Sequence, residues 1–329
     1  MPTNDEFARL TDSFRPQLLA HCYRMLGSVH DAEDQVQETM LRAWRSYGDF
    51  EGRASLRTWL YRIATNACLR ALENRSRRPM PSGLAGPGDD PAAQPGETLT
   101  DVPWLQPIPD AMFAPAVADP AATVASRESM RLALIAALQY LPARQRAVLL
   151  LRDVLGWRAA EVAETLGTTT AAVNSTLQRA RAQLEEIAPA EDDVYEPADP
   201  AQRALLDRYA TAFENADIPA LMQLLRDDAV LEMPPQPLWF AGRDMIGRFL
   251  AAWVLREPGV TRLIPTLANG QPALATYWRG DDGDFHAHGV QVLAFAGSSI
   301  ARIVSFNDAN LVEAFGHPAV LRATAAEPQ

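Results

Sequence analysis

The sequence contains no lysine, only two cysteines and no apolar run of membrane-spanning length. All 30 basic residues are therefore arginine, which we attribute to a GC-rich genome rather than to function. Cys22 and Cys68 are far apart and lack the spacing of metal ligands, so we expect no metal site and a reduced, cytoplasmic compartment. We expect no membrane helix, and the polar, acidic start MPTNDEFARL is unlike a secretory signal.

The net charge of −11 would argue against a nucleic-acid binder if the charge were evenly spread over the 329 residues. Residues 1–78 carry 12 Arg and 10 acidic residues, and residues 126–188 carry 8 and 6, so each segment has a net charge of +2. Residues 79–125 carry 6 acidic residues and no Arg, and residues 189–329 carry 10 Arg and 19 acidic residues. The division indicates two mildly basic modules, an acidic connection between them and an acidic domain after them.

Residues 157–184, WRAAEVAETLGTTTAAVNSTLQRARAQL, predict two short helices around a tight turn. Apolar residues recur with helical spacing on both sides of Gly167, which is suited to end the first helix, and three threonines can cap the second. The outer face of the second helix carries Asn174, Ser175, Gln178, Arg179 and Arg181. This pattern is typical of a helix-turn-helix whose second helix enters a major groove, although the stretch alone also fits a plain helical hairpin.

Residues 5–78 predict helices throughout, interrupted by a turn near Gly27 and by the loop FEGRAS at residues 50–55. The helix over residues 32–47 has an apolar face that includes Met40 and Trp44. Its opposite face carries Glu33, Asp34, Gln37, Glu38 and Arg42. Taken alone, such a polar run is typical of a solvated helix face.

The stretches DAEDQVQETMLRAW and FEGRASLRTWLYRIATNACLRALENRSRR closely resemble region 2 of extracytoplasmic-function (ECF) sigma factors of the sigma-70 class. LPARQRAVLLLRDVLGWRAAEVAETLGTTTAAVNSTLQRARAQL resembles their region 4. The two stretches lie in the expected order and together span about 130 residues. The resemblance implies an alternative sigma factor that binds core RNA polymerase and directs transcription initiation at minus-10 and minus-35 promoter elements. It implies no catalytic residue and no cofactor.

For region 2, the resemblance implies that the helix over residues 31–44 docks on a coiled coil of the largest polymerase subunit through Glu33, Asp34, Gln37, Glu38 and Arg42. It further implies that the loop with Phe50, Arg53 and Ser55, together with a helix start at Asn66, takes up a flipped base of the minus-10 element. Trp59 is a candidate to support the melted junction. Asn66 can offer a donor and an acceptor to a base edge, and its contacts must offset the cost of extruding the base. For Trp59, a core position is the favoured alternative.

For region 4, which in this family also contacts the polymerase flap, the resemblance places the reading positions on Asn174, Ser175, Gln178 and Arg179. Arg179 suits guanine, whereas Asn and Gln suit adenine. Arg158 and Arg181 are expected to hold phosphates. The basic residues usual at the positions of Asn174 and Thr176 are missing here, which predicts a weaker phosphate contribution.

Residues 79–125 are rich in Pro, Ala, Gly and Asp and predict an extended tether. Within it, VPWLQPIP at residues 102–109 is too apolar for a spacer, and both a docking segment and local packing on a flanking domain fit it. Residues 126–188 form the second module, and residues 189–200 predict another acidic linker.

Residues 201–316 predict an α+β domain, because helices come first and strands at residues 261–267, 273–278, 285–295 and 300–306 follow. Asn269-Gly270 is a strong hairpin signal. The order resembles SnoaL-like cones of the nuclear-transport-factor-like superfold, followed here by a tail over residues 317–329. Such a domain is expected to regulate in cis and could respond to a small ligand or a regulator.

The cone could enclose a polar pocket, although an interior filled by aromatics is favoured. The candidate lining residues are Tyr209, Trp239, Trp278, His286, His288 and Asn307. His286 and His288 share a strand face by the period of two, but no third metal ligand and no acid–base pair is evident. Two rival functions remain: a helix-turn-helix regulator without polymerase, and an enzyme with a DNA-binding arm.

Overall fold

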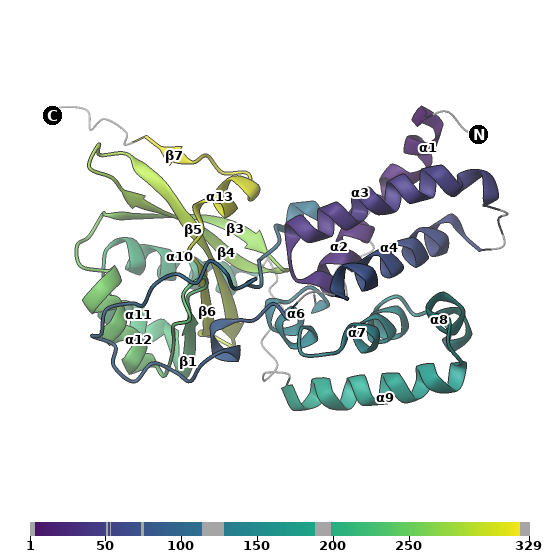
Figure 1. The fold of residues 1–329 in the computed structure, drawn as a ribbon. Helices are drawn as coiled ribbons and strands as arrows, with labels where there is room; N and C mark the ends of the chain where they lie inside the picture. Colours follow the sequence, from purple (N-terminus) through teal and green to yellow (C-terminus); the bar gives the residue numbers. More distant parts are fainter. Residues whose placement is uncertain are drawn as a thin grey trace. The chain divides into compact units, whose positions relative to one another are not determined.

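The computed structural model describes residues 4–50, 52, 54–73, 76–113, 128–187 and 199–322. It divides into a helical unit, residues 1–78 and 110–189, and a C-terminal unit, residues 79–109 and 190–329 (Figure 1). The predicted fold class, helical modules followed by an α+β domain, is confirmed. No helix in the described ranges is long and apolar enough to cross a membrane.

The helical unit is built from two sets of helices. The first set is α1 (Asn4–Thr11), α2 (Arg15–Leu26), α3 (Val29–Ser46) and α4 (Leu56–Leu72). The second set is α6 (Leu132–Leu138), α7 (Ala143–Leu149), α8 (Ala159–Leu166) and α9 (Thr170–Ile187). A wider π-helical turn, Leu150–Val154, continues α7.

Local signals in the sequence set the helix boundaries of the first set. Gly27 ends α2 in a left-handed conformation (φ 68°), and Ser28 begins α3 by accepting a hydrogen bond from the Asp31 N–H. Ser55 caps α4 in the same way, with Thr58 N–H as the donor at 3.1 Å. Serine side chains satisfy backbone donors that have no partner in the first turn of a helix.

The C-terminal unit begins with helices α10 (Pro200–Glu214) and α11 (Ile218–Leu224) and adds α12 (Arg243–Phe249) and α13 (Ala309–Ala314). A short π-helical turn, Leu250–Val254, extends α12. Its strands are β1 (Leu225–Glu232), β2 (Trp239–Ala241), β3 (Thr261–Ala268), β4 (Gln271–Arg279), β5 (Phe285–Ala296), β6 (Ser299–Phe306) and β7 (Val320–Leu321).

The strands form one sheet in the order β2-β1-β6-β5-β4-β3, and β7 pairs with β5. All pairs are antiparallel except β1 with β6. The predicted turn at Asn269-Gly270 joins β3 to β4, and both residues have positive φ (58° and 70°), as a two-residue hairpin turn requires. The core lies between the sheet and α10 to α12. The short strands β2 and β7 were not predicted from the sequence.

The segment 79–109, which we call the strap, lies on the C-terminal unit and follows its surface without a long helix or strand of its own. Leu105 and Ile108 are fully buried and Trp104 is 9% exposed. Asn269 holds the end of the strap, because its side-chain oxygen accepts from the Ile108 N–H and its own N–H donates to the Ile108 carbonyl, both at 3.0 Å. Two interpretations were open for VPWLQPIP, a docking segment and local packing on a flanking domain. In the structure it packs on the C-terminal unit.

Candidate nucleic-acid and polymerase interfaces

The predicted helix-turn-helix is formed by α8 and α9. Gly167 ends α8 with φ 61°, and the Thr168 N–H donates to the Ala163 carbonyl at 2.9 Å, which closes the last turn. Thr169 Oγ1 accepts from the Ala172 N–H at 3.2 Å and so caps α9. The turn is therefore fixed by its own residues and presents the first turns of α9 outward.

Helix α9 buries one face and exposes the other. Val173, Leu177 and Ala180 are at most 6% exposed and pack inside the helical unit. The four predicted reading residues are all exposed: Asn174, Ser175, Gln178 and Arg179. They lie on one face because their positions are one turn apart, so α9 offers donors and acceptors over two turns.

The two predicted phosphate contacts differ in their present partners. Arg181 makes a two-pronged ion pair with Asp153, with N–O distances of 2.7 and 2.9 Å, and these hydrogen bonds raise its pKa. Arg158 lies at the start of α8 with its side chain 87% exposed and only a 3.8 Å contact to Glu161. Arg158 is the freer cation of the two, and Arg181 must leave Asp153 to bind a phosphate.

The predicted polymerase-binding face of α3 is accessible. Asp34 and Gln37 are exposed, and Glu33 is half-buried. Glu38 and Arg42 are one turn apart and pair with each other at 2.5 Å. The structure thus brings the five predicted residues together on one face of α3, with two of them already neutralising each other.

An apolar groove of about 580 Å³ adjoins this face. Its walls come from α1, the first residue of α2, and α3: Phe7, Ala8, Thr11, Arg15, Gln37, Met40, Leu41 and Trp44. Leu41 is 50% exposed and Trp44 is 43% exposed. The helical period predicts Trp44 on the same apolar face as Met40, but Met40 is buried and Trp44 is exposed. The i, i+3 spacing of Leu41 and Trp44 indicates a second apolar stripe.

Aromatic side chains cluster at the predicted minus-10 loop. The rings of Phe50 and Trp59 have centroids 4.9 Å apart, and Tyr47 contacts both of them at 6.0 and 6.3 Å. Phe50 and Trp59 are half-buried. Trp59 therefore packs against the loop while keeping an exposed edge, and Arg53 lies outside the described residues.

Asn66 lies in the middle of α4, not at a helix start as expected. It is half-buried, and its side-chain N–H donates to the Arg62 carbonyl at 3.0 Å. Ser55 caps the helix 11 positions earlier, which corresponds to about 16 Å along the helix axis. The structure therefore does not bring Asn66 together with Ser55.

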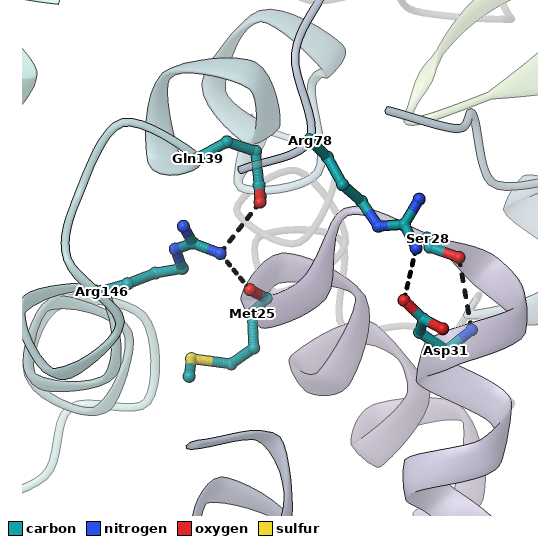
Figure 2. Close-up of polar contacts among 6 residues, drawn as sticks. All are labelled: Met25, Ser28, Asp31, Arg78, Gln139 and Arg146. Atoms are coloured by element: carbon teal, nitrogen blue, oxygen red, sulfur yellow. Dashed lines mark hydrogen bonds and ion pairs between the residues drawn. The ribbon is translucent and has the colours of Figure 1, made fainter. Parts of the chain in front are cut away.

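Arg146 of α7 crosses from the second set of helices to the first (Figure 2). Its side chain donates to the Met25 carbonyl at the end of α2, to Gln139 Oε1 at 3.0 Å and to the Leu141 carbonyl at 3.2 Å. The last carbonyls of a helix lack partners within it and carry partial negative charge. Burial lowers the pKa of Arg146 to about 10, so the group stays cationic near neutral pH.

Three further arginines join the two sets of helices. Arg24, itself 5% exposed, donates to Ser129 Oγ at 2.7 Å. Arg62 pairs with Glu164 of α8 at 2.8 Å, and the guanidinium of Arg77 lies 4.3 Å from the ring centre of Tyr140. We call these contacts, with that of Arg146, the seam. The two modules predicted from the sequence are therefore packed into one unit.

Four of the six candidate pocket residues of the C-terminal unit line one cavity: Tyr209, Trp278, His288 and Asn307. Trp239 instead donates to the strap at the Ala85 carbonyl, 2.8 Å away. His286 is exposed and lies 3.0 Å from Asp282. The two histidines lie in different surroundings, because β5 has an irregularity between them. The β4–β5 pairing passes from Gly289 to Ala287 and leaves His288 unpaired in the ladder.

Comparison with known proteins agrees with this division. Family models for sigma-70 region 2, sigma-70 region 4 and a SnoaL-like domain match residues 10–78, 131–184 and 206–303. The ECF RNA polymerase sigma factor SigG of Mycobacterium tuberculosis is 51% identical over 316 residues, which cover 95% of this chain and 84% of SigG. SigJ of the same organism is 29% identical over 76% of this chain and 74% of SigJ.

The crystal structure of Mycobacterium tuberculosis SigJ resembles the whole fold, with a TM-score of 0.62, 25% identity and coverage of 95% of this chain and 99% of SigJ. The exposed faces of α3 and α9 lie within the matched regions 2 and 4. Sequence identity, domain order and fold all agree. The chain belongs to the ECF RNA polymerase sigma factors, with a SnoaL-like domain at its C-terminal end.

Proposed function

We propose that this sigma factor binds core polymerase through the α3 face and its apolar groove, and reads the minus-35 element through Asn174, Ser175, Gln178 and Arg179. The observation that carries the proposal is the exposure of both faces on a unit whose interior is otherwise well packed. Exposed Leu41 and Trp44 offer a partner apolar area, and the acidic residues beside them add charge complementarity to a basic partner.

For the minus-10 element, we propose that the loop and Asn66 contact different nucleotides. The 16 Å or so between Ser55 and Asn66 equals about five stacked-base steps of 3.4 Å, which is too far for one flipped base. The aromatic cluster of Phe50 and Trp59 provides a stacking surface for an unpaired base. Asn66 then serves a second position further along the strand.

Run-off transcription with purified core polymerase tests the assignment. We expect promoter-dependent transcripts from the full chain and none from core polymerase alone. A helix-turn-helix regulator would bind DNA without polymerase and give no transcript, and this result would overturn the proposal.

We further propose that the C-terminal unit controls regions 2 and 4 in cis through the strap, which connects the two regions in the chain. The Ser82 N–H donates to Glu232 at 3.0 Å, the Gly88 N–H to the Trp239 carbonyl at 2.8 Å and the Leu99 N–H to the Pro235 carbonyl at 3.1 Å. While these bonds hold, residues 79–109 are withheld from polymerase and DNA. Release of the strap gives the connection its full reach.

Truncations at two points address this control. Ending the chain near residue 188 removes the sheet and leaves Leu105 and Ile108 without cover, so we expect reduced transcription. Removing residues 316–329 takes away the short strand β7 but leaves the other six strands in place, and we expect increased transcription. Equal activities of both truncations and the full chain, at equal polymerase occupancy, would show that the C-terminal unit has no control.

A substitution in the strap separates release from loss of the domain. A Cβ on Gly88 would lie 2.7 Å from the ring of Phe240, which is 1% exposed, whereas a Cβ on Gly86 meets nothing within 4 Å. Gly88→Ala should therefore loosen the strap and raise transcription, and the matched variant Gly86→Ala should not. Equal behaviour of the two variants would contradict control through the strap.

We also propose that the C-terminal unit is not an enzyme and that the chain acts in the cytoplasm, together with polymerase and promoter DNA. In support, the cavity that holds His288 has no carboxylate among its described lining residues to serve as a partner acid or base. Isomerase and hydrolase assays of the full chain test this proposal. Turnover in either assay would show that the C-terminal unit is an enzyme.

A further inference from the structure

The C-terminal unit encloses a cavity of about 60 Å³ between α10, α12 with its π-helical extension, and the sheet. Its apolar wall is formed by Phe213, Leu231, Met233, Phe249, Leu250, Val254, Trp278 and Ile303. Its polar wall is formed by Tyr209, Thr261, Thr276, His288, Gln291, Ser305 and Asn307. A space of this size holds about four to six water-sized groups.

The polar wall is neutral near pH 7. It contains no Asp, Glu or Arg among its described residues. Burial lowers the pKa of His288 and raises that of Tyr209, so the imidazole and the phenol are both uncharged. The Tyr209 hydroxyl donates to Gln291 Oε1 at 3.0 Å. An ion entering this space would lose its hydration and find no charged partner.

One hydroxyl in the cavity wall has no partner. Thr261 is 2% exposed, and its Oγ1 makes no hydrogen bond to any residue that the structure describes. The hydroxyls of Thr276 and Ser305, by contrast, donate to the Gly289 carbonyl and to Asn307, both at 2.9 Å. A buried hydroxyl without a hydrogen bond costs free energy. A molecule that hydrogen-bonds to Thr261 would remove this cost without breaking a hydrogen bond of the protein.

We propose that this cavity binds a small neutral molecule of about four to six non-hydrogen atoms, which hydrogen-bonds to Thr261 and places its apolar part against Trp278 and Phe249. The ligand must carry a carbonyl, amide or alcohol group that can hydrogen-bond to the Thr261 hydroxyl. Carboxylates, phosphates and amines of the same size are excluded, because the wall offers no opposite charge.

The cavity wall is directly connected to the strap, and this second step rests on the proposed control in cis. Asn307 lines the cavity, and its N–H donates to the Pro234 carbonyl at 2.8 Å. The next residue, Pro235, accepts from the Leu99 N–H of the strap at 3.1 Å. A ligand that moves Asn307 therefore changes the turn that holds Leu99.

Acetamide and acetate provide a matched pair of probes, because they have the same shape and differ in charge. We expect saturable binding of acetamide to the full chain, measured by saturation-transfer NMR, and binding of acetate at least tenfold weaker. Thr261→Val keeps the shape of the side chain and removes its hydroxyl, and should weaken acetamide binding about fivefold to tenfold. Thr266→Val, on the same strand but outside the cavity wall, should leave it unchanged.

Equal binding of the two probes, no saturable binding of acetamide, or equal effects of the two threonine variants would overturn the site. Hydrogen exchange of the Leu99 N–H with and without acetamide tests the connection to the strap. An unchanged exchange rate while acetamide binds would overturn that connection and leave the site standing. Failure of the proposed sigma function is seen separately, because run-off transcription is measured without any probe.

Discussion

Two regions of the helical unit use charge in opposite ways. The outer faces of α3 and α9 carry charged and polar side chains that are largely exposed, such as Asp34 and Arg179. The seam contains Arg24 and Arg146, which are at most 5% exposed and donate their hydrogen bonds to other segments of the helical unit. An exposed charge contributes little to stability, whereas removal of a buried one leaves its partners unsatisfied. The outer faces should therefore govern binding, and the seam should govern folding.

The strongest test on the binding side is reversal of charge on α3. Asp34→Arg with Glu38→Arg should abolish co-purification with core polymerase, because it replaces the acidic face and breaks the Glu38–Arg42 pair. The free energy of unfolding should change by less than about 1 kcal/mol, since both sites are accessible to solvent. Retained binding would show that polymerase docks elsewhere.

The matching test on the folding side is Arg146→Met. The change leaves the Met25 carbonyl and Gln139 without their donor, so we expect a loss of about 2–4 kcal/mol in the free energy of unfolding. Urea denaturation measures this loss. Arg144→Met, an exposed arginine on the same helix, is the control and should cost less than about 0.5 kcal/mol. Similar losses in both variants would remove the distinction between seam and surface.

On α9, Arg179→Ala should cost about 1–3 kcal/mol of promoter binding and relax discrimination at one position of the minus-35 element. Arg181→Ala should weaken all sequences alike and reduce the salt dependence. We expect a smaller effect at Arg181, because its pair with Asp153 must break before it meets a phosphate. Competition binding over several salt concentrations separates the two, and equal loss of discrimination would contradict this division.

A pH titration of stability tests a buried histidine of the helical unit, His21. Burial, with a contribution from Arg24, lowers the pKa of His21 from 6.5 to about 3. Below pH 6.5, His21 is protonated in the unfolded chain but stays neutral in the folded chain. The free energy of unfolding therefore decreases as the pH is lowered from about 6.5 to about 3. Between pH 6.5 and 5 the loss is about 2 kcal/mol.

His21→Gln keeps a possible hydrogen bond to Thr65, which His21 contacts at 2.9 Å, and removes the titration. Its unfolding free energy should vary with pH by about 2 kcal/mol less than that of the unaltered chain over the same interval. Parallel pH profiles would show that His21 is protonated in the folded state as readily as in the unfolded state.

Local signals made much of the fold predictable. Gly167 and the threonines after it fix the turn before α9, and Asn269-Gly270 fixes a hairpin, because each requires only neighbouring residues. The exposed reading face of α9 follows directly from the helical period. The family resemblance supplied the roles of these residues, and the structure supplied their exposure.

Contacts between distant segments were not predictable in the same way. Nothing local in the sequence indicates that Arg146 meets a carbonyl 121 positions away, or that Asn269 holds Ile108. An isolated arginine in a helix is usually solvated, and a Pro-rich segment is usually extended. The separation of His286 from His288 also depended on an irregular strand pairing that a period of two does not reveal.

The strap also has a consequence for synthesis. The C-terminal unit is assembled from two stretches that the chain makes at different times, since residues 79–109 precede region 4 while their partners Glu232, Trp239 and Asn269 follow it. Domains generally fold as units in order of synthesis. Both polymerase- and DNA-binding regions are therefore complete before the strap has a sheet to dock on. Each newly made molecule therefore passes through an interval in which the strap is undocked, and the proposed control in cis can begin only after β6, which joins β1 to β5, has been translated.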